Sequence, residues 1–223
     1  MDLRRDICMR QRLFVLQLPL TIFILLVLAS SIVSYVIIYS ALTSHASPFR
    51  GDYLRLKNKY LETDFPKVFY AAEWETVNAS SGNVYTLSFS PIDLRAIMNF
   101  IVYDEKATQT IMNENHLSDA FSVCVFEAKR MYDRFLGNNV NASLFFVENG
   151  TMKMSNLEAN YTRITVKDGL KAEDGTLSNI TGLFMSGINQ QKLFEIIFYG
   201  QEKDWNQISL QEAFRNILNS TKI

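Results

Sequence analysis

The sequence is poor in the residues that define several protein classes. Its 223 residues include two Cys, four Pro and nine Gly. Two Cys exclude a disulfide-rich scaffold, and the low Pro and Gly content excludes a collagen-like or low-complexity chain. The 22 Lys+Arg and 23 Asp+Glu give a net charge of −1. This balance argues against a nucleic-acid partner, because nucleic-acid binders usually carry a basic excess.

Recognisable catalytic and metal-binding motifs are also missing. The two histidines are His45 and His116, and no HExxH, GxSxG, Walker-type or GxGxxG pattern occurs. We therefore expect no cofactor, no metal and no enzymatic activity. The alternative is an enzyme that uses carboxylate chemistry at Glu73, Glu75 or Asp104.

Residues 13–42 form one apolar run without a charged residue. As a helix this run measures roughly 45 Å, and about 20 residues suffice to cross a hydrocarbon core. The run therefore predicts a transmembrane signal anchor. A cleaved signal peptide that leaves a secreted domain is the alternative, although its apolar core usually spans only about 7–15 residues.

The charges that flank this run predict its orientation. Four Arg lie within residues 1–12, whereas no Lys or Arg follows the run until Arg50. Positive residues tend to stay in the cytosol, which predicts a type II single-pass protein with a lumenal or extracellular C-terminal part. We expect the protein to lie in the membrane of the endoplasmic reticulum or Golgi, or in the plasma membrane. Cys8, just before the run, is a candidate for palmitoylation, with an unmodified thiol as the alternative.

Six N-x-S/T sequons agree with this orientation, because all lie beyond the predicted span, where glycosylation takes place. These glycosylation candidates are Asn78, Asn141, Asn149, Asn160, Asn179 and Asn219.

The chain is expected to have four segments: a cytosolic tail at 1–12, the anchor at 13–42, a stalk at 43–66 and one lumenal or extracellular domain at 67–223. Within the stalk, Tyr53, Leu56 and Tyr60 show helical spacing and predict a short helix.

The last segment mixes strand and helix patterns without a βαβ rhythm, which predicts an α+β fold with an antiparallel sheet and a few helices. Alternating and apolar runs predict the strands, and the apolar run at 97–103 leaves its type open. An Asn-Gly pair predicts a hairpin turn, and Ser209 to Glu212 form a capping box that opens a helix. The expected elements are strands at 68–70, 83–89 and 161–166, helices at 118–136 and from 209, and a hairpin at 144–154 that turns at Asn149-Gly150.

Cys124 is the one cysteine beyond the predicted span, and it lies in an apolar stretch. One interpretation is a buried free thiol. The other is an interchain disulfide that makes a homodimer, because the odd count of cysteines in an oxidising compartment leaves Cys124 without an intrachain partner.

The order of features resembles the BRICHOS family of type II precursors. Ile101–Asp104 is similar to the strand that ends in the Asp of this family, and Cys124 stands where its first Cys follows. Gly182–Ile188 and Glu195–Tyr199 resemble its last two strands. The sequence departs from the family at Asn189, where the second Cys is expected, so the disulfide of the family cannot form. Val125 also replaces the usual aromatic residue.

The resemblance implies a chaperone that shields an aggregation-prone β segment of its own chain. The run Ile32–Tyr39 is rich in β-branched and aromatic residues and is a candidate for this segment if it leaves the bilayer. The alternative is an ordinary stretch of membrane helix, in which such residues are common. In the chaperone reading Asp104 has a raised pKa through burial; the alternative is a surface turn residue. We expect a non-enzymatic domain that binds a protein or peptide, and the alternative is an accessory subunit of a membrane complex.

Overall fold

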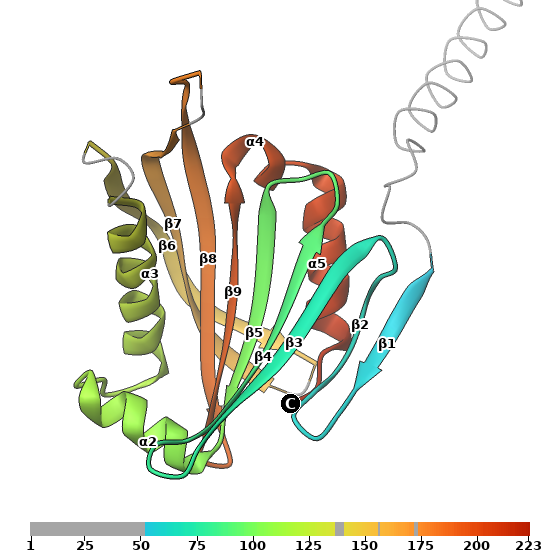
Figure 1. The fold of residues 1–223 in the computed structure, drawn as a ribbon, viewed down its shortest axis with the longest axis vertical. Coiled ribbons are helices and arrows are strands. Elements are labelled where there is room, and N and C mark those ends of the chain that lie inside the picture. Colours follow the sequence, from blue (N-terminus) through green and yellow to red (C-terminus); the bar gives the residue numbers. More distant parts are fainter. Residues whose placement is uncertain (1–51, 137–140, 156, 172–173) are drawn as a thin grey trace, which may run out of the picture. The chain divides into compact units, whose positions relative to one another are not determined.

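The computed structural model describes residues 52–136, 141–155, 157–171 and 174–223 (Figure 1). Its centre is a seven-stranded sheet of order β3-β4-β5-β9-β8-β7-β6, in which all neighbouring strands are antiparallel. The strands are β3 (Phe69–Asn78), β4 (Gly82–Pro91), β5 (Ala96–Tyr103), β6 (Ser143–Met154), β7 (Leu157–Lys171), β8 (Leu177–Asn189) and β9 (Lys192–Gln201). The edges of this sheet are β3 and β6.

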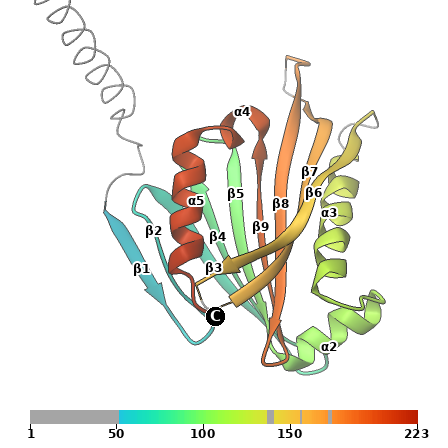
Figure 2. The same cartoon turned by 180° about the vertical axis from the view of Figure 1, so that it is seen from behind.

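Helices lie on both faces of the sheet. Between β5 and β6 the chain forms α2 (Glu105–Glu114) and α3 (Ala120–Leu136). After β9 it forms α4 (Glu202–Trp205) and α5 (Ile208–Ser220). Figure 1 shows α3 over the β6–β8 end of one face, and Figure 2 shows α5 on the opposite face. We call these the α3 face and the α5 face.

The α5 face carries the main core. Side chains alternate along a strand, so Met98, Phe100 and Val102 of β5 point to this face and are buried. Phe198 of β9 stacks on Trp205 and Phe214, with ring centroids 4.2 and 4.4 Å apart. The amphipathic pattern of α5 buries Leu210, Phe214, Ile217 and Leu218, as predicted from their spacing.

A two-stranded hairpin, β1 (Tyr53–Lys57) and β2 (Glu62–Pro66), packs against α5. The Thr63 and Thr221 hydroxyls lie 2.9 Å apart, and the Asp64 N–H donates to the Ser220 hydroxyl. The predicted stalk helix over Tyr53 to Tyr60 is therefore wrong. Its apolar residues are spaced for a helix, but a hairpin whose second strand packs on α5 stabilises this segment more than a helix would.

The predicted fold class and membrane topology are corrected by the structure. Sheet makes up most of the fold, and no helix in the described part of the chain is long and apolar enough to cross a membrane. The longest described helix, α3, has 17 residues and includes charged Glu127, Arg130 and Arg134. The predicted tail at 1–12 and span at 13–42 fall outside the described residues. The structure thus gives no support to a signal anchor or a single-pass membrane location.

One predicted turn and one predicted helix cap are also wrong. Asn149-Gly150 does not form a hairpin turn but lies inside the 12-residue β6, where Gly150 pairs with Tyr161. A Cβ on Gly150 would lie 2.9 Å from the Tyr161 ring, so the glycine makes room for that ring. The helix α5 begins at Ile208 with Gln207 as N-cap and without a side-chain cap, so the capping box at Ser209 is not used.

Other local predictions are confirmed. The helix at 118–136 corresponds to α3, and the strand at 83–89 to β4. The undecided run at 97–103 is strand, as part of β5. Glu73 and Glu75 lie on one face of the edge strand β3, as their spacing predicts.

Candidate functional site

Asp104 is a structural cap. One of its carboxylate oxygens accepts from the Ala107 N–H at the start of α2, and the other accepts from the Asn83 N–H at the start of β4, both at 2.8 Å. Gly82, at φ +89, lies so close that an added Cβ would be 2.5 Å from the Asp104 carboxylate. The carboxylate therefore ties the β3–β4 turn to the start of α2.

Cys124 belongs to α3 and is buried between this helix and the sheet. Its Sγ lies 3.0 Å from the Ser186 hydroxyl of β8 and 3.3 Å from the Asn160 carbonyl oxygen. Burial raises the pKa of this thiol to about 11, so it is a poor nucleophile at neutral pH. The predicted interchain disulfide would require α3 to move away from the sheet, because a disulfide needs the two Cα atoms within about 7 Å.

The sequons are spread over the domain. Asn78, Asn141, Asn149 and Asn219 are exposed, whereas Asn160 and Asn179 are half-buried. The Asn179 amide accepts from the Asp168 N–H and donates to Glu202. Cys8 lies outside the described residues.

The two halves of the α3 face are covered unequally. Helix α3 packs Cys124, Ala128 and Met131 against β7 and β8. In the other half, Trp74 of β3 is 50% exposed and Ile97 of β5 is 37% exposed. Two pockets occur here, and both are lined by Tyr199 of β9.

The first pocket, which we call the α3 pocket, lies between α3 and strands β3, β4, β5 and β9, with a volume of about 330 Å³. Trp74, Asn99 and Tyr199 line the side of the sheet, and Glu127 and Arg130 the side of α3. A guanidinium nitrogen of Arg130 lies 2.8 Å from one Glu127 carboxylate oxygen. The other Glu127 oxygen is buried and has no hydrogen-bond partner in the described part of the chain.

A second carboxyl group, that of Glu195 on β9, is buried close to Glu127. Glu195 is 1% exposed, and its oxygens make no well-formed hydrogen bond within the described residues, although the Tyr103 hydroxyl lies close to them. Burial, followed by the negative charge of Glu127, raises the pKa of Glu195 to about 8; Tyr103 and Arg130 act in the opposite direction. Burial also raises the pKa of Glu127, against the pull of Arg130 and Arg134. At neutral pH, Glu195 is therefore mainly a neutral acid beneath the pocket.

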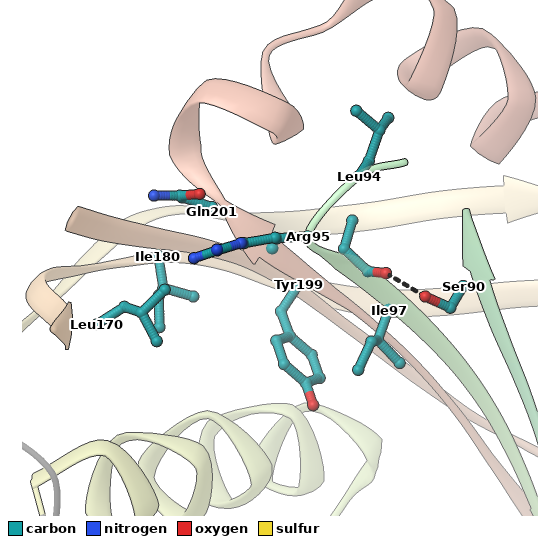
Figure 3. Close-up of a pocket in the computed structure, with 10 residues that line it drawn as sticks. Ser90, Leu94, Arg95, Ile97, Leu170, Ile180, Tyr199 and Gln201 are labelled. Atoms are coloured by element: carbon teal, nitrogen blue, oxygen red, sulfur yellow. Dashed lines mark hydrogen bonds between the residues drawn. The ribbon is translucent and has the colours of Figure 1, made fainter. Parts of the chain in front are cut away.

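The second pocket, which we call the Arg95 pocket, lies at the C-terminal end of β9, next to the α3 pocket, with a volume of about 340 Å³. Figure 3 shows Ile180, Leu170, Ile97 and Tyr199 around it, with the Arg95 side chain among them. The Arg95 backbone is held on both sides: its N–H donates to the Asp204 carboxylate, and its carbonyl accepts from the Gln201 N–H, both at 2.9 Å.

The α3 face has side chains that suit contacts with a ligand. Within the described ranges, no group of three or more His, Cys, Asp or Glu is placed to hold a metal. His116 stands in the turn after α2, with φ 53. Glu195 is sealed from solvent, and a general acid must come within hydrogen-bond reach of its substrate. Open apolar and aromatic side chains beside arginines are suited instead to recognising a ligand.

Sequence reasoning did not find Glu127, Glu195 or Arg95. A signal was present for two of them, because each glutamate stands within a run of apolar residues, Glu127 after Val125-Phe126 and Glu195 before Ile196-Ile197. A charged residue inside a buried pattern is rarely fully buried without a partner. Arg95 gave no signal, since an arginine in a turn is usually a solvated residue.

The sequence matches no protein-family model, and no curated protein is similar to it. Solved structures to which it is similar include the following two. Cyanobacterial PsbP (CyanoP) from Synechocystis sp. PCC 6803 is 13% identical, with 77% of this chain and 92% of that chain covered and a TM-score of 0.48. A protein from Bacteroides thetaiotaomicron VPI-5482 is 10% identical, with 77% and 48% covered and a TM-score of 0.38. These comparisons do not test the BRICHOS resemblance, which stays a prediction from sequence.

Proposed function

We propose that the domain of the described residues is a non-enzymatic module that binds a protein segment or peptide along the open half of the α3 face. The observation that carries this proposal is the half-exposed Trp74 at the mouth of the α3 pocket. Trp is enriched at binding hot spots because it offers a large contact area and loses little entropy.

The neighbouring edge strand suits an extended partner. Strand β3 pairs only with β4 among the described strands, so the backbone groups along its outer side face away from the sheet. An extended peptide adds to such an edge through main-chain hydrogen bonds, and side-chain pockets then supply specificity. Trp74 lies on this strand and faces the α3 pocket, so one segment of a partner can contact both.

A peptide-panning experiment tests the proposal. The full chain is panned against a random peptide display library, and the selected peptides are measured by fluorescence anisotropy against the full chain and against Trp74→Ala. We expect binding to weaken at least about tenfold in Trp74→Ala, as for a hot-spot residue. The matched control is Val77→Ala, because Val77 is 71% exposed on the same strand but lies on the other side of it.

Two outcomes would overturn the proposal: no selected peptide, or peptides that bind Trp74→Ala and the unchanged chain equally. A peptide copying Ile32–Tyr39 is a second probe, because the BRICHOS resemblance implies that this segment is the client. Its fibril formation in the presence of the full chain reports whether binding extends to chaperone activity.

A further inference from the structure

We infer that the Arg95 pocket binds the free C-terminal end of a peptide whose last side chain is aliphatic. This inference rests on the proposed function, because it names the part of the peptide that this second pocket would hold. Figure 3 shows the apolar wall on which it depends, with Ile97, Leu170 and Ile180 around the space and Arg95 beside Gln201.

The first argument is the charge of Arg95. Its guanidinium has no acceptor or carboxylate partner among the described residues, although its backbone is held on both sides. Of the two arginines that line the α3 pocket, Arg130 is paired with Glu127, and Arg134 also has an interaction partner. Arginine offers a planar set of donors that matches a carboxylate in a two-point contact. A fixed backbone with an unpaired guanidinium beside an apolar pocket is therefore complementary to a ligand that carries a carboxylate next to an apolar group.

The second argument is the unsatisfied side-chain oxygen of Gln201. Its amide nitrogen donates to the Ser178 hydroxyl at 2.7 Å, while its oxygen is buried and has no donor among the residues that the structure describes. Leaving a buried acceptor without a partner is costly. The exposed Arg95 side chain can hold a bound carboxylate beside Gln201. The N–H of a peptide's last residue lies close to its terminal carboxylate and supplies the missing donor, whereas a fatty acid has no such group.

The third argument is size and lining. The volume of about 340 Å³ is at the low end of the roughly 300–1,000 Å³ of small-molecule sites, which favours one branched side chain over a long acyl chain. Leu94, Ile97, Leu170 and Ile180 are aliphatic, and Tyr199 connects this pocket to the α3 pocket. A peptide that ends in the Arg95 pocket can therefore continue past Tyr199 toward Trp74.

The test compares two forms of one peptide. Fluorescein-labelled Gly-Ser-Ala-Ala-Ala-Leu with a free carboxylate and the same peptide with a C-terminal amide are titrated against the full chain by anisotropy. The free acid is expected to bind at least about tenfold more tightly, the usual size of a hydrogen bond to a charged group. Arg95→Gln should remove this preference, and Arg215→Gln, which changes an exposed arginine on α5, should keep it. Thermal unfolding checks that both variants fold.

Decanoate, which has the carboxylate but no N–H, is added as a competitor. Three results would overturn the inference: equal binding of acid and amide, a preference for the acid that survives in Arg95→Gln, or stronger binding of decanoate than of the peptide. If the acid peptide does not bind although panned peptides bind through Trp74, the inference fails and the proposed function stands. If no peptide binds in either experiment, both fail.

Discussion

The two faces of the sheet are built on different principles. The α5 face buries a continuous layer of aromatic and aliphatic side chains, among them Phe89, Phe100 and Phe198, under α5 and the β1–β2 hairpin. The α3 face is covered over only part of its width. It also contains two buried carboxyl groups and two pockets.

The α5 face mainly stabilises the fold, whereas the proposed binding surface lies on the α3 face. Large apolar side chains that exclude water contribute most to folding free energy, and they are concentrated on the α5 face. Buried carboxyl oxygens without partners cost stability, and exposed aromatic groups contribute little to it. They are tolerated on the α3 face because the opposite core stabilises the same strands.

The largest effect is expected in the main core. Phe198→Ala removes a ring that stacks on both Trp205 and Phe214 and should lower the free energy of unfolding by about 3–5 kcal/mol. Ile97→Ala, on the open α3 face of the neighbouring strand, should cost less than about 1 kcal/mol because Ile97 is already partly exposed. Urea denaturation of both variants measures the contrast. Equal losses would mean that the two faces contribute alike.

The covered part of the α3 face can be strengthened with a disulfide. Ser186→Cys places a second thiol opposite Cys124, whose sulfur lies 3.0 Å from the Ser186 oxygen. Oxidation should stabilise the fold by about 2–4 kcal/mol, the typical effect of closing a long loop. Mass spectrometry after thiol alkylation and thermal unfolding with and without reductant check this. Asn189→Cys is the control: it lies three positions further along β8 and so on the opposite face, and a bond from it to Cys124 would show that the register is different.

The buried acids should make stability depend on pH. The pKa of Glu195 is near 4.5 when unperturbed and about 8 in the fold, so between these values the folded state holds a proton that the unfolded state has lost. The free energy of unfolding should therefore fall as pH rises from about 4.5 to 8, by a few kcal/mol at about 1.4 kcal/mol per pKa unit.

Glu195→Gln should flatten this slope, as measured by urea denaturation at pH 5 to 9. The control Ile196→Val changes the next residue of β9, which faces the α5 core, and should lower stability equally at every pH. A slope that persists in Glu195→Gln would place the responsible group elsewhere.

The smallest effect is expected at the edge of the α3 face, where Asp104 caps α2. Asp104→Ala should cost about 1–2 kcal/mol, because the N–H groups of Ala107 and Asn83 lose their acceptor. Asp104→Asn should cost less, since Asn is also a good N-cap. Chemical denaturation distinguishes these variants, and identical stability of all three chains would show that the cap is not needed.

Local patterns predicted much of the secondary structure. The amphipathic repeat of α5, the extent of α3 and the alternation in β4 are encoded in short stretches, because helix and strand periods are local properties. The predictions failed where a distant contact decided. Tyr53 to Tyr60 form a hairpin because β2 packs on α5, and Asn149-Gly150 stays extended because the Tyr161 ring on β7 lies over Gly150.

The candidate site was harder to predict from sequence than the secondary structure. Asp104 and Cys124 stood out in the sequence, and the structure explains both through local packing. Arg95, Trp74 and Tyr199 come from a turn and two different strands. Their neighbourhood depends on the order of strands in the sheet, in which β5 lies next to β9.

The sequence alone determined the balance of charge, the scarcity of cysteine and histidine, and the periodic patterns that set α3, α5 and several strands. Only the tertiary structure decided on which face of the sheet each residue lies and what it contacts there. The place of Glu195 in a strand is a local property, but its buried environment comes partly from α3. The Arg95 guanidinium, which is unpaired among the described residues, becomes a candidate binding group only because Ile180 and Gln201 lie beside it. Periodicity acts over a few residues, whereas burial, pKa and pocket shape depend on side chains brought together from distant parts of the chain.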